Sequence, residues 1–114
     1  MAIQDGFSPS YWRNERDTIS GSSTFNSDGV ELSQFKAVKY IFSAWNDTEG
    51  KNLSMEVMVN NRGSSVSDTV YTKLGDRDLG IQVGAVVNSG AMSLEVVNNE
   101  TYDIIISVFR LIII

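Results

Sequence analysis

Carboxylates are the side chains of this sequence with the clearest capacity for chemistry. Asp76 and Asp78 form an Asp-x-Asp pair in the stretch GDRDLG, and such oxygens can bind a cation or transfer protons. A calcium loop needs more oxygen ligands at set spacing, so we interpret this pair as a solvated turn. Glu56 and Glu95 resemble the two carboxylates of a glycosidase, but each alternates with apolar residues in a predicted strand, where outward-facing glutamates are ordinary.

Histidine and cysteine are both missing from the sequence. Their absence removes Ser-His-Asp and Cys-His catalysis, imidazole-ligated zinc, thiolate metal sites and disulfides. The Gly-Ser-Ser stretches at residues 21–23 and 63–65 lack the Gly-x-Ser-x-Gly elbow and a phosphate-binding lysine, so we interpret them as loops. We therefore predict a protein that is not an enzyme, with no catalytic, cofactor-binding or metal-binding residue.

The chain is acidic, with a formal net charge of −5 over 114 residues. This balance disfavours nucleic-acid binding, in which Lys and Arg neutralise phosphates. No basic segment followed by an apolar one opens the chain, so we expect no secretory signal and synthesis in a cytoplasm. The most apolar run, residues 102–114, is too short to cross a bilayer as a helix, which needs about 20 residues. No membrane partner is predicted.

Strand patterns dominate the chain from Val30 onward. Segments rich in Val, Ile and aromatic residues are separated by turns that contain Asn and Gly, and they predict strands over residues 35–45, 53–60, 66–74, 81–87, 92–96 and 102–114. No helical period interrupts them. We therefore predict an all-β fold, an antiparallel β-sandwich or jelly-roll-like domain over residues 30–114.

Residues 1–29 differ from the rest, because they are polar, rich in Ser, Gly and Asn, and hold the only proline. They show no sustained period, which predicts an extended N-terminal arm with at most short strands around Ile19 and Phe25. Within this arm, the stretch YWRNERD places two aromatic residues beside alternating charges. Either these aromatic residues cover an open end of their own core, or the arm lies on a neighbouring subunit with Trp12 and Arg13 as anchors.

The last run, YDIIISVFRLIII, is apolar on both faces of a predicted strand. One face holds Tyr102, Ile104, Ile106, Val108 and Ile112, and the other holds Ile105, Phe109, Leu111 and Ile113. Such a strand needs cover on both sides, since an exposed apolar strand invites aggregation. It is either a central strand covered by a loop or by the arm, or a strand that packs one face inward and buries part of the other against identical subunits. We favour the second explanation, which predicts a subunit or capsid interface of Tyr11, Trp12, Arg13, Phe109, Leu111, Ile112 and Ile113.

Three aromatic residues of the predicted strands could instead contact a glycan: Tyr40, Trp45 and Tyr71. Sugar sites on β-sandwiches use exposed aromatic rings beside polar residues, and Asn46 and Asp47 follow Trp45 directly. Core packing is the alternative interpretation for these side chains, above all for Trp45.

Three basic residues interrupt otherwise apolar strands: Lys36, Lys39 and Arg110. Each is expected either to be a solvated charge on an outer face or to pair with a carboxylate such as Glu56 or Glu95, because an unpaired charge is rarely buried. The sequence leaves both alternatives open.

Five segments resemble a recurring β-sandwich module of tailed-bacteriophage virion structural proteins. They are FKAVKYI (Phe35 to Ile41), MEVMVNNRG (Met55 to Gly63), VYTKLG (Val70 to Gly75), GAMSLEV (Gly90 to Val96) and VFRLI (Val108 to Ile112). Together the resemblance covers residues 33–113. Members of this family often carry a histidine in the turn after the Glu-Val strand, where this chain has Asn60-Asn61-Arg62, so no metal or ligand role of that histidine is carried over.

The resemblance implies a part of a virion, made in the host cytoplasm, and no enzyme. A small β-domain with an adhesive arm is similar to capsid decoration (cement) proteins, which commonly brace the outer shell as trimers. The expectation is therefore a decoration protein that stabilises the head through a homotrimer and contacts with the major capsid protein. The alternatives are a tail, neck or fibre subunit, or a module that binds host glycans.

Overall fold

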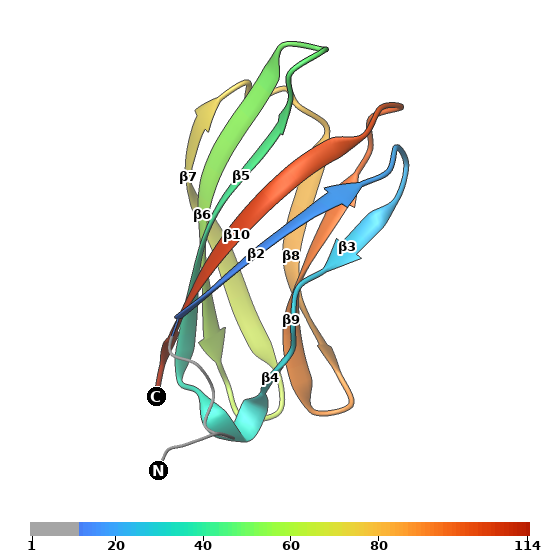
Figure 1. Ribbon diagram of the computed structural model, residues 1–114. Coiled ribbons are helices and arrows are strands. Elements are labelled where there is room, and N and C mark those ends of the chain that lie inside the picture. Colours follow the sequence, from blue (N-terminus) through green and yellow to red (C-terminus); the bar gives the residue numbers. More distant parts are fainter. Residues whose placement is uncertain (1–11) are drawn as a thin grey trace.

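The computed structural model describes residues 12–114, which form two antiparallel β-sheets packed face to face (Figure 1). The larger sheet has the strand order β2-β10-β5-β6-β7, with β2 at Trp12–Ile19, β10 at Ile104–Ile113, β5 at Ala37–Asn46, β6 at Lys51–Asn61 and β7 at Val66–Gly75. In the smaller sheet, β9 (Ala91–Asn98) pairs with β8 (Ile81–Asn88) along one side and with β3 (Thr24–Asn26) and β4 (Val30–Glu31) along the other. The predicted all-β antiparallel sandwich is confirmed.

A short 3-10 helix, η1 (Leu32–Gln34), joins the smaller sheet to β5 in the larger one. No helix within residues 12–114 is long and apolar enough to cross a membrane.

Strand β10 occupies the interior of the larger sheet, between β2 and β5. Its residues alternate between the two faces as the sequence predicts: Ile104, Ile106, Val108 and Ile112 are buried in the core, and the residues between them face outward. Because β2 and β5 both pair with β10, the apolar terminal run has no free edge. Its outer face remains exposed at Leu111 and Ile113.

The core consists of the inward-facing residues of both sheets. Alternate residues of β5, β6 and β9 enter it, among them Phe42, Leu53, Met55, Met92 and Leu94. Burial of each such side chain contributes about 1.5–3 kcal/mol, so the alternation of apolar residues fixes which face of each strand turns inward.

Residues 12–19 lie in the larger sheet as the eight-residue strand β2, although the sequence predicts at most a short strand around Ile19. The prediction falls short because β2 is an edge strand with mostly polar and charged side chains, which conceal the alternation seen in the other strands. Phe25 lies in the three-residue strand β3. Tyr11 lies outside the described residues.

Arg110 is buried on the inner face of β10, so the prediction of an outer-face charge or of a pair with a strand glutamate is wrong. Its Cα lies opposite Arg13 of β2 and Tyr40 of β5. The Arg110 Nη1 atom donates a hydrogen bond of 3.3 Å to the carbonyl oxygen of Asp28, whose carboxylate pairs with Arg13. Asp28 lies between β3 and β4 of the smaller sheet. Its contacts with Arg110 and Arg13 of the larger sheet could therefore not be identified from the sequence.

Asn98 at the end of β9 is a fully buried polar side chain that joins three segments. Its amide nitrogen donates to the carbonyl oxygens of Ile19 at 3.0 Å, Ser20 at 3.2 Å and Tyr102 at 2.9 Å. Its Oδ1 atom accepts a hydrogen bond from the backbone of Glu100 at 2.9 Å. The side chain therefore fixes the end of β2 against the turn that leads into β10.

We expect Asn98→Ala to lower the free energy of unfolding by about 2–3 kcal/mol, because it leaves buried carbonyl groups without a donor. The measurement is urea denaturation followed by circular dichroism. Asn14→Ala, at an exposed position of β2, is the control and should change stability by less than about 0.5 kcal/mol. Equal losses in the two variants would contradict this role of Asn98.

Candidate interaction surface

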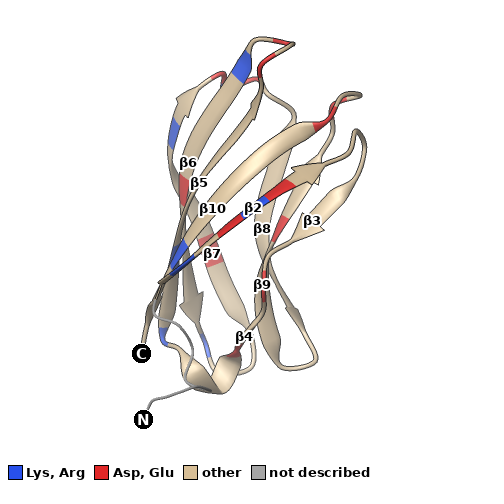
Figure 2. Cartoon of the chain, viewed as in Figure 1, with Lys and Arg blue, Asp and Glu red and all other residues tan. Residues whose placement is uncertain are grey.

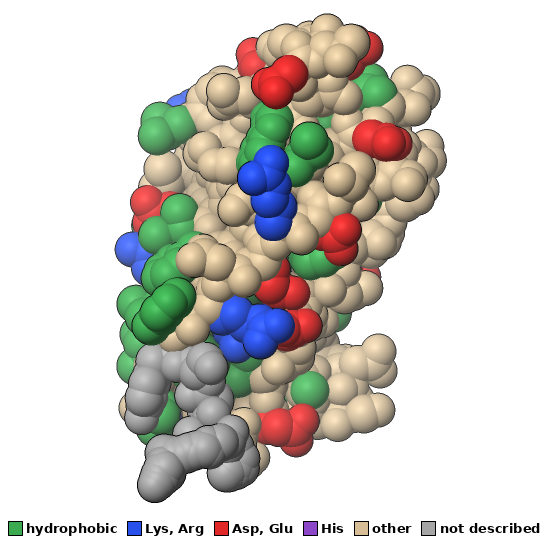
Figure 3. All heavy atoms as spheres, viewed as in Figure 1, with side chains coloured by type: hydrophobic (Ala, Val, Ile, Leu, Met, Phe, Trp, Pro, Cys, Tyr) green, Lys and Arg blue, Asp and Glu red, His purple; other side chains and the backbone are tan. Residues whose placement is uncertain are grey.

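The outer face of the larger sheet carries a group of apolar side chains, called here the outer apolar patch. It consists of Trp12 of β2, Ile41 of β5, and Phe109, Leu111 and Ile113 of β10. Figure 3 shows hydrophobic side chains gathered along one side of the face that presents β2 and β10. Contiguous exposed apolar side chains of this kind mark interaction surfaces in soluble proteins.

The register of β2 and β10 brings the two aromatic rings of the patch together. Trp12 lies opposite Leu111, which makes Phe109 its diagonal neighbour, within reach of a large ring. The Trp12 and Phe109 rings stack with centroids 6.4 Å apart and an interplanar angle of 23°. Trp12 is nevertheless 62% exposed, so most of its surface is available to another molecule.

Four of the residues predicted for a subunit interface are brought together in this patch: Trp12, Phe109, Leu111 and Ile113. The other described residues of the prediction are not. Ile112 points into the core and is only 4% exposed, because it has the opposite parity to Leu111 and Ile113 on β10. Arg13 lies on the other face of β2, where it pairs with Asp28.

Tyr40 cannot contact a glycan at the surface, because its side chain is 0% exposed. It alternates with the outward residues Lys39 and Ile41 of β5 and therefore belongs to the core. Its hydroxyl donates to the sulfur of Met92 at 3.5 Å, and burial raises the pKa of the hydroxyl above its usual value. The suggestion of Tyr40 as a glycan contact is thus wrong.

Trp45 and Tyr71 lie on the outer face but do not meet, since β6 separates their strands. Trp45 is half-buried, with the guanidinium of Arg16 over its ring at 5.2 Å from the centroid. Arg16 is not singled out by the sequence, because its position beside β5 depends on the pairing of β2 with β10. Tyr71 is 49% exposed.

Tyr71 joins Lys39 and Glu56 in a polar cluster on the outer face. The Tyr71 hydroxyl donates to Glu56 Oε1 at 2.6 Å, and Lys39 Nζ lies 3.2 Å from the same oxygen and 5.9 Å from the centre of the Tyr71 ring. The expectation of a pair between a strand lysine and Glu56 is confirmed for Lys39. A β-bulge at Tyr71, between the residues opposite Glu56 and Val57, places the ring here, and no sequence signal marks it.

The cluster shifts the pKa values of both charged members. The hydrogen bond from Tyr71, followed by the contact with Lys39, lowers the pKa of Glu56 below its usual 4.5. The Tyr71 hydroxyl and the Glu56 carboxylate together raise the pKa of Lys39 above 10.5. The Glu56 carboxylate and the Lys39 ammonium therefore both stay charged over a wider range of pH than they would alone.

The carboxylates considered for chemistry do not form a common site. Asp76 Oδ2 accepts a hydrogen bond from the backbone of Asn52 at 2.9 Å in the turn after β7, as the turn interpretation predicts. Glu56 and Glu95 lie in different sheets and both alternate with buried residues, so they face outward on opposite sides of the sandwich. Within residues 12–114, no group of three or more acidic side chains is close enough to hold a metal ion.

Neither a protein-family model nor a curated protein matches this chain. Solved structures with a similar fold include the tailspike protein of Acinetobacter baumannii phage AM24, with a TM-score of 0.53 and 6% sequence identity over 87% of this chain. Two others are tailspike gp49 of A. baumannii bacteriophage Fri1, described as a capsular polysaccharide depolymerase (TM-score 0.49, 14% identity, 87% of this chain), and the Acinetobacter phage vB_ApiP_P1 tailspike (TM-score 0.47, 11% identity, 97% of this chain).

The chain spans only 25%, 17% and 24% of the lengths of these three tailspikes, respectively. The similarity to the AM24 tailspike shows that this sandwich fold occurs as one part of a larger phage tailspike protein.

We expect the pKa of Glu56 to rise towards 4.5 in Tyr71→Phe, because this change removes only the hydroxyl that contributes most to the lowered value. The lowered folded-state pKa means that Glu56 stabilises the fold fully above its unfolded pKa, and that this contribution is lost as the pH falls through the folded value. NMR titration of the Glu56 side-chain carboxyl measures the shift. Tyr102→Phe is the control; an unchanged pKa in Tyr71→Phe would contradict the assignment.

Proposed function

We propose that this chain is a structural β-sandwich domain of a bacteriophage tail, as part of a tailspike or tail fibre. The observation that carries the proposal is the fold shared with the AM24 tailspike, of which the chain spans about a quarter. Because the AM24 protein of similar fold is a tailspike, it favours the tail or fibre alternative over the capsid decoration protein that the sequence favours. Contact with the major capsid protein belongs to that less favoured interpretation.

The domain associates with further copies of itself through the outer apolar patch. Trp12, Phe109 and Leu111 offer aromatic and aliphatic surface of the kind that carries most binding energy at protein interfaces. A homotrimer, with the three patches directed towards a common axis, would bury this surface in a closed assembly. This role requires no catalysis, and the Asp76 and Glu56 carboxylates engaged in turn and surface hydrogen bonds are consistent with it.

We expect the wild-type protein to form a discrete oligomer that persists on dilution. Leu111→Asp should dissociate this oligomer and weaken self-association by about 100-fold, because it places a charge at a central apolar contact of the interface. Native mass spectrometry over a range of concentrations measures it. Leu74→Asp is the matched control, because Leu74 is also exposed on the larger sheet but lies outside the patch. A wild-type protein that is monomeric throughout, or equal effects of the two variants, would contradict the proposal.

Glycan binding at Tyr71 is a second candidate function. The observation that favours it is a surface depression of about 150 Å³ whose lining includes Glu56, the partner of the exposed Tyr71 ring. The depression is lined by Ile41, Ser54, Met55, Glu56, Thr72 and Leu74. The hydrogen bond to Glu56 and the β-bulge fix the orientation of the ring before any ligand arrives, which reduces the entropic cost of binding.

If Tyr71 binds a glycan, NMR titration with bacterial surface oligosaccharides should perturb the signals of residues around Tyr71. Tyr71→Ala should then weaken the binding by about tenfold or more. Trp12→Ala is the control, since it removes an exposed ring of the outer apolar patch instead. The absence of any perturbed residue near Tyr71, or an equal loss in Trp12→Ala, would exclude this site.

A further inference from the structure

Strand β8 forms a free edge of the smaller sheet. It pairs with β9 along one side, and no other strand within residues 12–114 pairs with its second side, which faces β7 of the larger sheet (Figure 1). The backbone N–H of Ala85 points to this second side, because it donates to Asp68 Oδ2 of β7 at 2.8 Å. Since peptide groups alternate along a strand, the N–H and C=O groups of Val83 and Val87 point the same way.

The side chains of β8 give this edge no protection against pairing. Its sequence, IQVGAVVN, contains no charged residue, whereas the edge strand β2 carries four and the edge strand β7 carries two together with a β-bulge (Figure 2). Charges and bulges on edge strands are the usual devices that prevent one sheet from adding to another. Among these three long edges, β8 alone lacks both devices.

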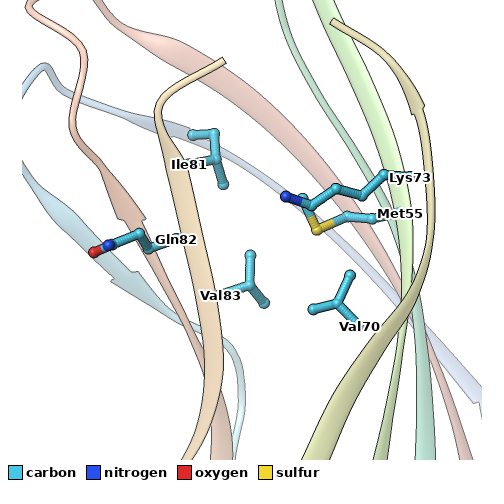
Figure 4. A pocket seen from close by; sticks show the side chains of 6 residues that line it. All are labelled: Met55, Val70, Lys73, Ile81, Gln82 and Val83. Atoms are coloured by element: carbon cyan, nitrogen blue, oxygen red, sulfur yellow. The ribbon is translucent and has the colours of Figure 1, made fainter. Parts of the chain in front are cut away.

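An incompletely filled space lies beside this edge, between β8 and β7. An open cleft of about 390 Å³ is lined by Met55, Val70, Lys73, Ile81, Gln82 and Val83, and all of these side chains except Gln82 point into the gap between the strands (Figure 4). Further along β8, Val87 lies on the inner face of the strand and is 38% exposed. A strand added to β8 would therefore cover apolar surface as well as unpaired backbone groups.

The sequence of β8 is complementary to itself in an antiparallel pair with a two-fold axis at Ala85. In this register Val83 lies opposite Val87 of a second copy, and Gly84 lies opposite Val86. Gln82 lies opposite Asn88, so that amide side chains meet each other at both ends. The backbone groups that point to the free edge are those that such a register would join.

We propose that the β8 edge is a self-pairing surface for a second copy of this chain, and that Asp68 holds it closed. The Asp68 carboxylate accepts a hydrogen bond from the N–H of Ala85, the residue at the centre of the self-complementary register. Pairing would also bring two Asp68 carboxylates close to the same two-fold axis, where like charges repel. Asp68 thus supplies from β7 the protection that β8 lacks. This inference is independent of the outer apolar patch, which lies on the opposite side of the larger sheet.

The test compares Asp68→Ala with wild type in a Leu111→Asp background, so that association through the outer apolar patch does not contribute. The chain has no cysteine, so Ala85→Cys introduces a single thiol that self-pairing would place opposite its own copy. Ala85 and its copy would form a hydrogen-bonded antiparallel pair, in which the Cα atoms are about 5.5 Å apart, within the range of a disulfide. Under mild oxidation, we expect about tenfold more disulfide-linked dimer with Asp68→Ala than with Asp68 in place, corresponding to about 1.4 kcal/mol.

Two controls isolate the role of Asp68. Asp47→Ala removes an equal charge from the exposed turn between β5 and β6 and should leave the amount of dimer unchanged. Ser93→Cys places the thiol on the outer face of β9, where it should form little dimer in either background. The proposal would be overturned if the amount of dimer were the same with and without Asp68. It would also be overturned if Ala85→Cys and Ser93→Cys gave the same amount of dimer.

Amide hydrogen exchange gives a second readout that does not depend on the folding of Asp68→Ala. In the Leu111→Asp protein with Asp68 intact, the Ala85 amide should exchange at least about tenfold more slowly than those of Val83 and Val87, because among residues 12–114 only Ala85 has an acceptor at this edge. Equal protection of all three amides would mean that the edge is already covered, and would contradict the proposal that Asp68 holds the β8 edge closed.

Discussion

The pairing of β10 on both of its sides is the constraint on which the larger sheet depends. Within residues 12–114, strand β2 has no other neighbour in the sheet, and β5 would lose half of its ladder without β10. The same strand supplies both a row of core residues and most of the outer apolar patch, because its two faces are apolar in alternation. Stability of the sandwich and the proposed assembly surface therefore arise from one segment of sequence.

Much of the fold follows from the sequence because burial selects alternate residues. Leu53, Met55, Val57 and Val59 of β6 face the core as their spacing predicts, and the two faces of β10 are assigned correctly. The candidate patch is also partly predictable. Trp12 and Phe109 are large apolar residues outside the core-facing rows, and this placement distinguishes them in the sequence itself.

The remaining features depend on relations between distant strands. Tyr40 is mistaken for a surface residue because β5 has apolar side chains on both faces, so alternation alone does not say which face turns inward. Strand β2 is concealed by its charges, and the β-bulge that orients Tyr71 leaves no mark on the residue types. The contact of Asp68 with Ala85 joins two sheets across 17 positions of sequence, and only the packed structure reveals it.

The position of β10 has a consequence for synthesis on the ribosome. Of the described strands, β10 is translated last, yet it stands between β2, the first of them, and β5. Until β10 has emerged, β2 has no place in the larger sheet, whereas β5, β6 and β7 can already pair as neighbouring hairpins. In the nascent chain, β2 therefore cannot pair with β10 until synthesis has reached residue 113. The larger sheet then closes in a late step with a high entropic cost of loop closure.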